Sequence, residues 1–153
     1  MRIDPLTHVN EASIQQALES SLSEGYDFVQ KLLDEYLSGV NRFDQHGAVL
    51  LGVWDSGTLA GFGGVHPDIY LNRPEIGRVR HVYVLPAYRR SGVGRQLMQA
   101  LITHARQFYE VLTLRTLTAH GDAFYKSLGF SDTPRYEQAT HWLELKTPIL
   151  TDL

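Results

Sequence analysis

The chain has 153 residues, of which 43% are hydrophobic and 20% charged, with a net charge of −3 at pH 7. This length and composition suit one domain, residues 1–153, that buries a substantial core. No apolar run approaches the roughly 20 residues of a membrane-spanning helix, and no signal-peptide pattern opens the chain. The lack of cysteine excludes disulfides, thiolate metal sites and cysteine nucleophiles, and a cytoplasmic protein is the default expectation.

The first half of the chain predicts a strand, two helices and a hairpin. Residues 1–3 form a short strand that Pro5 ends. Apolar residues at helical spacing predict helices over residues 14–22 and 28–39. Two apolar runs then predict strands, which a short turn with glycine joins: residues 48–54, the turn 55–57, and residues 58–65.

The second half opens with a buried strand over residues 79–85, which Pro86 stops. A long amphipathic helix follows, because apolar residues recur on one helical face: Val93, Leu97, Leu101, Ala105 and Phe108. Residues 111–117 predict the next strand, and residues 121–128 a short helix.

Gly129 is placed to cap that short helix. Residues 138–146 predict an edge strand, with a short strand near residues 130–136 as its partner. The order of elements predicts an α/β fold, in which helices cover both faces of a mixed central sheet.

The segment between the strand at 79–85 and the long helix is rich in glycine and arginine, and it runs Arg89-Arg90-Ser91-Gly92-Val93-Gly94-Arg95. The two glycines let the backbone approach a ligand closely. The unpaired N–H groups of a helix start, with arginines among them, favour phosphate. A dinucleotide fingerprint would need glycine where Leu97 stands, and a Walker A loop would need Gly-Lys-Ser/Thr. The alternative is a tight strand-to-helix turn with surface arginines.

The charge is unevenly distributed along the chain. Residues 73–95 hold six arginines against one glutamate, a balance of +5. Residues 1–47 hold eight acidic and three basic side chains, a balance of −5. One positive patch beside an acidic remainder suits a compact polyphosphate better than a long nucleic acid. The acidic N-terminal segment would favour a cationic amine as a second ligand.

Two blocks of the sequence resemble the GNAT superfamily of N-acetyltransferases. Arg89, Gly92 and Gly94 match the fixed positions of its acyl-coenzyme A loop, Arg/Gln-x-x-Gly-x-Gly/Ala. The block from Ala123 to Phe130, Ala-Phe-Tyr-Lys-Ser-Leu-Gly-Phe, is similar to a short helix late in these domains. The resemblance implies a mostly antiparallel mixed sheet of six to seven strands, in which the fourth and fifth strands splay apart to admit the pantetheine arm.

The resemblance also implies acetyl-CoA as co-substrate. Its pyrophosphate would bind the loop, and its arm would pair with the backbone of the strand before it. The cofactor-binding residues expected on this basis are Val82, Tyr83, Val84, Arg89, Arg90, Ser91, Gly92, Val93, Gly94 and Arg95. The backbone N–H of Val84 would polarise the thioester oxygen, and Tyr125 would act as general acid toward the leaving thiolate. The alternative for Tyr125 is an aromatic side chain that only packs.

The general base is where the sequence departs from the family. Arg78 stands where many relatives have glutamate, and an arginine cannot accept a proton at working pH. The remaining candidates are Glu75, His81, Tyr83 and His120. Strand alternation is expected to place His81 and Tyr83 on the face opposite to Arg80, Val82 and Val84. If Arg78 points into the acceptor cleft, it favours an acceptor that carries a carboxylate or phosphate.

The resulting prediction is an acetyl-CoA-dependent N-acetyltransferase that acts on a primary amine of a small molecule or protein, by direct attack in a ternary complex. The alternative is a non-catalytic module that binds and senses acyl-CoA. Nucleic-acid binding lacks a basic helix face, and a metal site lacks closely spaced histidine ligands. No membrane partner is expected, and a homodimer through the late strands stays open.

Overall fold

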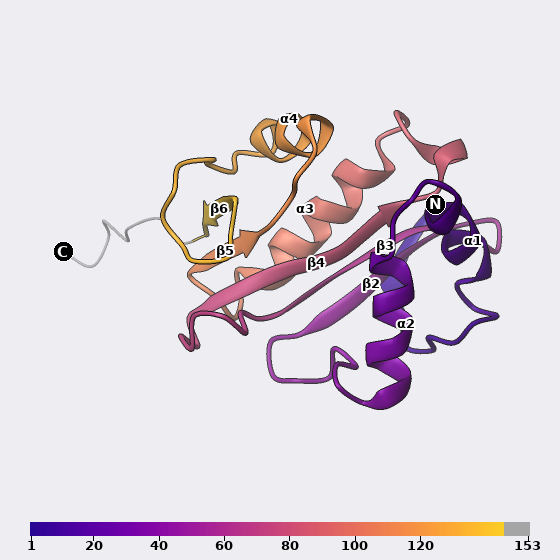
Figure 1. Ribbon diagram of the computed structural model, residues 1–153, viewed down its shortest axis with the longest axis horizontal. Helices are drawn as coiled ribbons and strands as arrows, with labels where there is room; N and C mark the ends of the chain where they lie inside the picture. Colours follow the sequence, from indigo (N-terminus) through magenta and orange to yellow (C-terminus); the bar gives the residue numbers. More distant parts are fainter. Residues whose placement is uncertain (146–153) are drawn as a thin grey trace.

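Six strands form one sheet in the computed structural model, which describes residues 1–145 (Figure 1). The strands lie in the sheet in their chain order and span β1 (Arg2–Pro5), β2 (Val49–Asp55), β3 (Thr58–Pro67), β4 (Ile76–Val84), β5 (Val111–Leu114) and β6 (His141–Glu144). β4 and β5 run parallel, and every other neighbouring pair is antiparallel. The predicted mixed, mostly antiparallel sheet is therefore confirmed.

Helices cover both faces of the sheet, as predicted, and the bounds are α1 (Gln15–Ser23), α2 (Phe28–Ser38), a 3₁₀ turn η1 (Pro86–Tyr88), α3 (Val93–Ala105) and α4 (Ala119–Ser127). α1 and α2 bury one hydrophobic cluster against the sheet, around Leu32 and Phe62. α3 buries the other, around Leu97 and Leu112, and α4 packs at the edge of that cluster. Figure 1 shows α3 and α4 on one side of β4, with α1 and α2 on the other.

The apolar stripe of α3 explains its position. Its buried side chains follow helical spacing: Val93, Leu97, Met98, Leu101, Ile102 and Ala105. Each large apolar side chain that leaves water stabilises the fold by about 1.5–3 kcal/mol. The helix ends at Ala105, and Phe108 lies in the turn that follows, where its N–H donates to the Ala105 carbonyl.

The hairpin between β2 and β3 forms as predicted. Ser56 and Gly57 have φ angles of +48° and +87°. Two consecutive left-handed residues match the twist of the flanking strands, which is why such a two-residue turn favours glycine.

The remaining differences from the sequence prediction are in the bounds of α4 and of the strands. α4 begins at Ala119 rather than at 121, and Pro5 is the last residue of β1, where it pairs with Leu51, rather than the residue that ends a strand over residues 1–3. β4 begins at Ile76 rather than at 79, and β5 ends at Leu114 rather than at 117. The predicted strand at 130–136 is reduced to a single bridge between Ser131 and Trp142. β6 begins at His141 rather than at 138, and Lys146, the predicted last residue of that strand, lies outside the described residues.

Candidate active site

β4 and β5 separate after a short common stretch. Residues 76–78 of β4 pair with residues 111–113 of β5, and β4 then continues to Val84 without a strand beside it on that edge. Figure 1 shows the chain leaving β5 toward α4 while β4 runs on toward η1. An unpaired strand edge is a template for an extended chain that carries amide groups. Val82, Tyr83 and Val84 lie on this open part of β4.

A β-bulge interrupts β4 at its open part. Phe62 pairs with Tyr83 and Gly64 with Arg80, so that His81 and Val82 together face one residue of β3. His81 has a φ angle of +63°, the left-handed conformation that such an extra residue can adopt. The bulge bends the strand next to the separation of β4 from β5.

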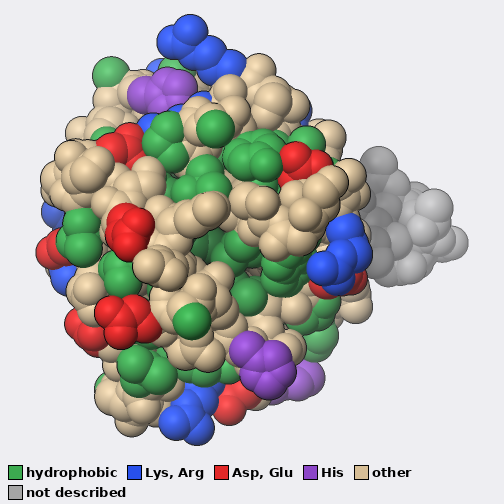
Figure 2. Space-filling model, turned by 90° about the vertical axis from the view of Figure 1, so that its right-hand side faces the viewer, with side chains coloured by type: hydrophobic (Ala, Val, Ile, Leu, Met, Phe, Trp, Pro, Cys, Tyr) green, Lys and Arg blue, Asp and Glu red, His purple; other side chains and the backbone are tan. Residues whose placement is uncertain are grey.

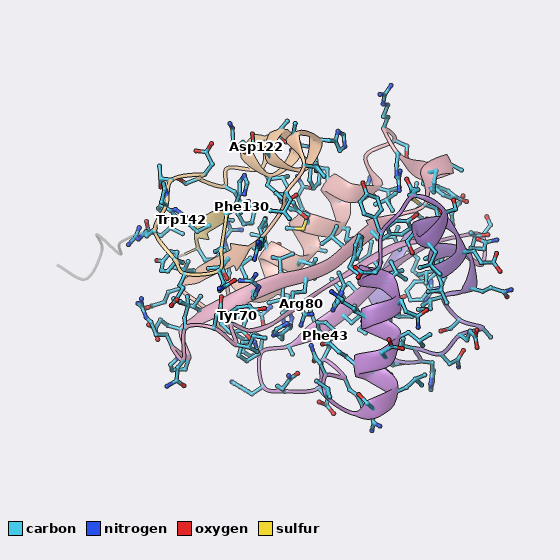
Figure 3. The ribbon with its side chains drawn as sticks, viewed as in Figure 1. Phe43, Tyr70, Arg80, Asp122, Phe130 and Trp142 are labelled. Carbon is cyan, nitrogen blue, oxygen red and sulfur yellow. The ribbon has the colours of Figure 1, made fainter. Side chains whose placement is uncertain are left out.

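The bulge also changes which side chains share a face. Arg80 points toward α2, where its guanidinium donates to Glu35 at 3.0 and 3.3 Å. His81 lies on the same face against Phe43, and Figure 3 places Phe43 and Arg80 together on that side of β4. The expectation that Arg80 lies opposite His81 is therefore wrong, because the extra residue shifts the alternation by one.

Val82 and Val84 lie on the opposite face, toward α3, as alternation predicts. Their side chains pack at the edge of the α3 cluster. Close approach of β3 to this segment depends on glycine, since a Cβ at Gly63 would lie 2.9 Å from a methyl of Val82.

The loop before α3 presents free backbone donors. Gly92 caps the helix with a φ angle of +86°, and Arg90 also has a positive φ, +63°. Among the described residues, none of the backbone N–H groups of residues 90–95 has a hydrogen-bond acceptor, whereas the next one, of Gln96, donates to the Gly92 carbonyl at 3.0 Å. These donors lie at the positive end of the α3 dipole, an arrangement that fits the pyrophosphate of a coenzyme A molecule.

The three arginines of the loop are placed differently. Arg89 donates from both terminal nitrogens to Glu24, at 2.6 and 2.8 Å, and from Nε to the Val84 carbonyl at 3.0 Å. Arg95 donates to the Ser127 hydroxyl at 2.9 Å. Arg90 is exposed and has no side-chain hydrogen bond within the described chain. The Ser91 hydroxyl donates to the Tyr88 carbonyl.

α4 lies against the start of α3. A Cβ added at Gly94 would lie 3.4 Å from the Phe124 ring and 3.8 Å from a methyl of Val84. The loop, the open end of β4 and α4 therefore meet around Gly94.

Tyr125 follows Phe124 on α4 and packs edge-on against Phe124 and Phe130, with ring centroids 5.1 and 5.6 Å apart. Burial raises the pKa of Tyr125 to about 12. Its hydroxyl has no hydrogen-bond partner among the described residues, and the residue as a whole is partly exposed. The phenol is therefore protonated at neutral pH and free to donate.

On the α1–α2 face, Tyr83 connects β4 to α1. Its hydroxyl donates to Glu24 at 2.5 Å and lies 2.7 Å from the Ser20 hydroxyl. The hydrogen bond from Arg89 holds the pKa of Glu24 below its ordinary value. Glu24 could not be predicted as a site residue, since no local sequence pattern marks the carboxylate at the end of α1.

Arg78 is buried on the same face, with a side-chain exposure of 6%. One nitrogen donates to the Gln138 carbonyl at 2.9 Å, another lies 3.7 Å from Asp68, and the Tyr70 ring covers the guanidinium. Burial lowers the pKa of Arg78, and Asp68 opposes this shift. Protein groups thus surround Arg78, while its Nη1, 3.7 Å from Asp68, has no hydrogen-bond partner among the described residues.

The four candidate bases occupy different environments. Glu75 pairs with Arg73 at 2.6 Å, and Tyr83 bonds Glu24 as described. His81 is buried, and burial lowers its pKa to about 3, so its imidazole is neutral but weakly basic. His120 lies in α4 and is exposed. The structure does not gather these four groups at one place.

Ion pairs narrow the positive patch that the sequence predicts over residues 73–95. Four of its six arginines form ion pairs with carboxylates: Arg73 with Glu75, Arg78 with Asp68, Arg80 with Glu35, and Arg89 with Glu24. Arg90 and Arg95 remain at the start of α3. Figure 2, which views the α1 side, shows charges of both signs scattered around a hollow with hydrophobic side chains.

Two hollows of about 270 and 280 Å³ lie elsewhere on the described surface, one beside Tyr36 and Phe43 and the other beside Gln16 and Thr58. Neither includes the loop at 89–95 or Tyr125. No helix within residues 1–145 has the length and apolarity to cross a membrane. The same part of the chain contains no group of three His, Asp or Glu side chains arranged to hold a metal ion.

Comparison with known proteins agrees with this geometry. The model of the Acetyltransferase (GNAT) family matches residues 12–130, which confirms the resemblance seen in the sequence. No sequence among curated proteins matches the chain.

Many solved structures share its fold, among them these three. A proposed acetyltransferase from Exiguobacterium sp. 255-15 is 27% identical, with a TM-score of 0.82, over 94% of this chain and 92% of that one. A proposed GNAT acetyltransferase from Desulfovibrio desulfuricans is 20% identical, with a TM-score of 0.73, over 95% and 99%. A GNAT N-acetyltransferase from Escherichia coli, in complex with CoA, is 19% identical, with a TM-score of 0.72, over 95% and 81%.

Proposed function

Since the chain belongs to the GNAT family of acetyltransferases, we propose that it moves an acetyl group from acetyl-CoA to a primary amine of a small molecule or protein. The observation that carries this proposal is the unpaired edge of β4 next to the free N–H groups of residues 90–95. One surface binds an extended amide-containing arm, and the other binds phosphate. The complex of the Escherichia coli relative with CoA supports the choice of ligand.

In this proposal, the N–H groups of Arg90, Ser91, Gly92, Val93, Gly94 and Arg95 hold the pyrophosphate. Arg90 adds charge because it has no competing partner among the described residues, while Arg89 orients the loop through Glu24 and the Val84 carbonyl. The backbone of Val82, Tyr83 and Val84 holds the arm as an added strand would. No metal takes part in this scheme.

Acetyl transfer requires a neutral amine, a polarised carbonyl and a proton for the leaving sulfur. The amine nitrogen attacks the thioester carbonyl carbon within a ternary complex, and the carbon–sulfur bond breaks. The nitrogen releases its proton to solvent water, and the proton that Tyr125 gives to sulfur is later replaced from solvent. The N–H of Val84 polarises the carbonyl oxygen. Tyr125 donates its proton to the sulfur, a role in which a general acid contributes roughly 10²–10⁴-fold.

The acceptor side of this proposal is the α1–α2 face of β4, which carries Tyr83, Glu24 and Arg80. Arg78 contributes positive electrostatic potential toward a carboxylate or phosphate of the acceptor. Because Arg78 is buried, it acts through this potential rather than by direct contact with the acceptor. An acceptor with both an amine and an acidic group, such as an amino acid or a peptide terminus, suits this face. A cytoplasmic location belongs to the same proposal.

The second candidate function is an acyl-CoA sensor without turnover, which the arginine at position 78 favours. Calorimetric titration with acetyl-CoA, with NAD and ATP as controls, tests the shared binding step. Micromolar binding of acetyl-CoA alone supports both functions, and no binding overturns both.

Thiol release from acetyl-CoA with a panel of amines then separates the two functions. Turnover that falls in the Tyr125→Phe variant, at unchanged acetyl-CoA affinity, supports the enzyme. Binding without turnover for every amine supports the sensor. A salt-sensitive shift of DNA at micromolar protein would instead revive nucleic-acid binding, which this proposal excludes.

A further inference from the structure

α4 carries Tyr125, yet apolar burial fixes this helix only weakly. None of its side chains, from Ala119 to Ser127, is fully buried. Phe124, Tyr125 and Leu128 pack at the edge of the α3 cluster and remain partly accessible. A short helix with so little buried surface depends on other contacts for its position.

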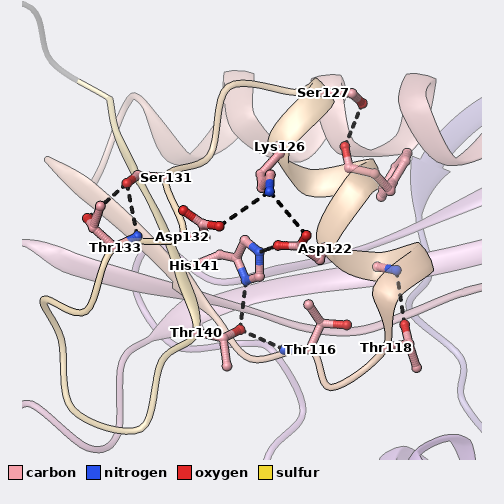
Figure 4. Close-up of polar contacts among 12 residues, drawn as sticks. Thr116, Thr118, Asp122, Lys126, Ser127, Ser131, Asp132, Thr133, Thr140 and His141 are labelled. Carbon is pink, nitrogen blue, oxygen red and sulfur yellow. Dashed lines mark hydrogen bonds and ion pairs between the residues drawn. The ribbon is translucent and has the colours of Figure 1, made fainter.

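A polar network around the buried side chain of His141 supplies such a contact (Figure 4). His141 of β6, whose side chain is 4% exposed, places Nε2 2.8 Å from Oδ1 of Asp122 on α4. Its Nδ1 lies 2.7 Å from the hydroxyl of Thr140, which accepts the N–H of Thr116 at 2.9 Å. The network therefore joins α4 to β6 and to the loop between β5 and α4.

One placement of the hydrogens gives every polar atom in these contacts of His141, Thr140 and Asp122 a partner. The Asp122 carboxylate can only accept, so Nε2 of His141 carries a hydrogen. Thr140 accepts from Thr116 and donates its own proton to Nδ1. The hydrogen bond from His141, followed by that from Lys126, lowers the pKa of Asp122 and keeps it ionised at neutral pH. A satisfied network around a buried imidazole favours one arrangement of the elements that it joins.

The same imidazole flanks Tyr125. The ring centroids of Tyr125 and His141 are 6.3 Å apart, and Phe130 lies 5.6 Å from Tyr125. Asp122 precedes Tyr125 by three residues, so the two side chains share one face of α4. One histidine thus contacts the aromatic ring and anchors the helix that carries it.

We propose that Asp122 and His141 are positioning residues that hold the Tyr125 hydroxyl in place for proton transfer. This inference rests on the proposed function, in which Tyr125 is the general acid. Neither residue touches the reacting atoms in this scheme. Their effect is large because a displacement of about 1 Å at a reacting group can lower a rate by as much as ~10²-fold.

The test compares two substitutions that differ in one property. Asp122→Ala removes the acceptor of His141 Nε2, whereas Asp122→Asn keeps an oxygen acceptor of the same size. Lys126→Ala is the matched control, because it removes the ion pair to Asp122 at 3.2 Å from the same helix and leaves the imidazole contact intact. Each substitution is made in the parent and in the Tyr125→Phe variant, with folding checked by circular dichroism. If Asp122→Ala does not fold, Asp122→Ser replaces it, because the serine side chain is shorter than that of aspartate.

In the parent, Asp122→Ala is expected to lower kcat roughly 10- to 100-fold, with the KM for acetyl-CoA within about twofold. Asp122→Asn and Lys126→Ala are expected to stay within about threefold of the parent. In the Tyr125→Phe background, Asp122→Ala should lower kcat less than about twofold further, since residues that act through one another are not additive.

An equal loss of kcat in both backgrounds would overturn the positioning role, and so would a parental kcat in Asp122→Ala. A parental kcat in Tyr125→Phe would instead overturn the general acid itself. The two failures are therefore distinguished by the same set of variants.

Discussion

The Glu24 carboxylate accepts hydrogen bonds from both terminal nitrogens of the Arg89 guanidinium, at 2.6 and 2.8 Å. Glu24 caps α1, and Arg89 opens the glycine loop before α3. Arg89 also donates from Nε to the Val84 carbonyl at 3.0 Å, at the end of β4. One guanidinium thus connects a helix of the α1–α2 face, the open strand and the loop proposed to bind phosphate.

The acid stability of the protein should depend in part on this pair. Arg89 holds the pKa of Glu24 below its ordinary value, so the pair stabilises the fold above the unfolded pKa of about 4.3 and loses that effect as pH falls through the lower, folded pKa. Glu24→Gln is expected to lower the free energy of unfolding at pH 7 by at most about 1 kcal/mol, since both side chains are partly in water.

Urea unfolding of the parent and of Glu24→Gln, at pH 7 and again below pH ~4, measures this difference. The gap should shrink at the acid pH. Glu11→Gln serves as the control, because Glu11 is exposed and has no ion pair within residues 1–145. A gap that grows on acidification would contradict the role of the pair.

Gly94 offers a sharp test of the phosphate site. A Cβ there would lie 3.4 Å from the Phe124 ring, an ordinary contact, so Gly94→Ala should fold and bind acetyl-CoA within about threefold of the parent. Gly94→Gln adds bulk, and Gly94→Glu adds the same bulk with a negative charge. Calorimetry is expected to show Gly94→Glu binding at least about tenfold more weakly than Gly94→Gln, because a carboxylate repels phosphate. Equal affinities would place the phosphates elsewhere.

Elements with a strong local signal, such as a regular apolar spacing or a turn sequence, could be predicted from the sequence. Strand bounds that depend on pairing with a neighbouring strand could not. The stripe of α3 and the Ser56-Gly57 turn are local signals. The start of β4 has no such signal, since Gly77 and Arg78 interrupt the apolar run after Ile76. Gly77 belongs to the strand because it pairs with Pro67 and Leu112, and because a Cβ there would meet the Tyr109 ring at 2.6 Å.

The candidate site also has a part that the local sequence predicts and a part that depends on distant residues. The glycine loop and its free N–H groups follow from a local pattern, since a helix start leaves its donors unpaired in any context. The partners of its side chains come from far along the chain: Glu24 is 65 residues from Arg89, and Asp122 is 19 residues from His141. The bulge at His81 also has no local marker, which is why alternation failed for Arg80.

Tyr109 provides a prediction on stability. Its hydroxyl is buried and has no hydrogen-bond partner in the described part of the chain, and burial raises its pKa to about 12. Tyr109→Phe removes an unsatisfied polar group, so the free energy of unfolding at pH 7 should stay constant or rise by up to about 1 kcal/mol.

The loss of stability at alkaline pH should also differ between the parent and Tyr109→Phe. A raised folded pKa means that the neutral phenol stabilises the fold below the unfolded pKa of about 10 and that this effect is lost as pH rises toward the folded pKa. Urea unfolding should therefore show the parent losing more stability than Tyr109→Phe between pH 9 and about 11. Tyr26→Phe is the control, since Tyr26 is 41% exposed. A loss of stability in Tyr109→Phe at pH 7 would reveal a partner for the hydroxyl.

The pH dependence of turnover tests Tyr125 as the proton donor. Because burial raises its pKa to about 12, the phenol stays protonated well above neutrality. For an acceptor amine with a pKa of about 10.4, kcat/KM should rise with pH as the neutral amine forms, and no descending limb should appear below about pH 10. Tyr125→Phe should lower kcat by about 10²-fold across this range. Tyr136→Phe removes a phenolic hydroxyl outside α4 and keeps the ring contact with Trp142, so it is the matched control and should keep the parental profile. A parental descending limb near pH 9 that disappears in Tyr125→Phe would place the pKa of Tyr125 below its ordinary value of about 10 and contradict a pKa raised by burial.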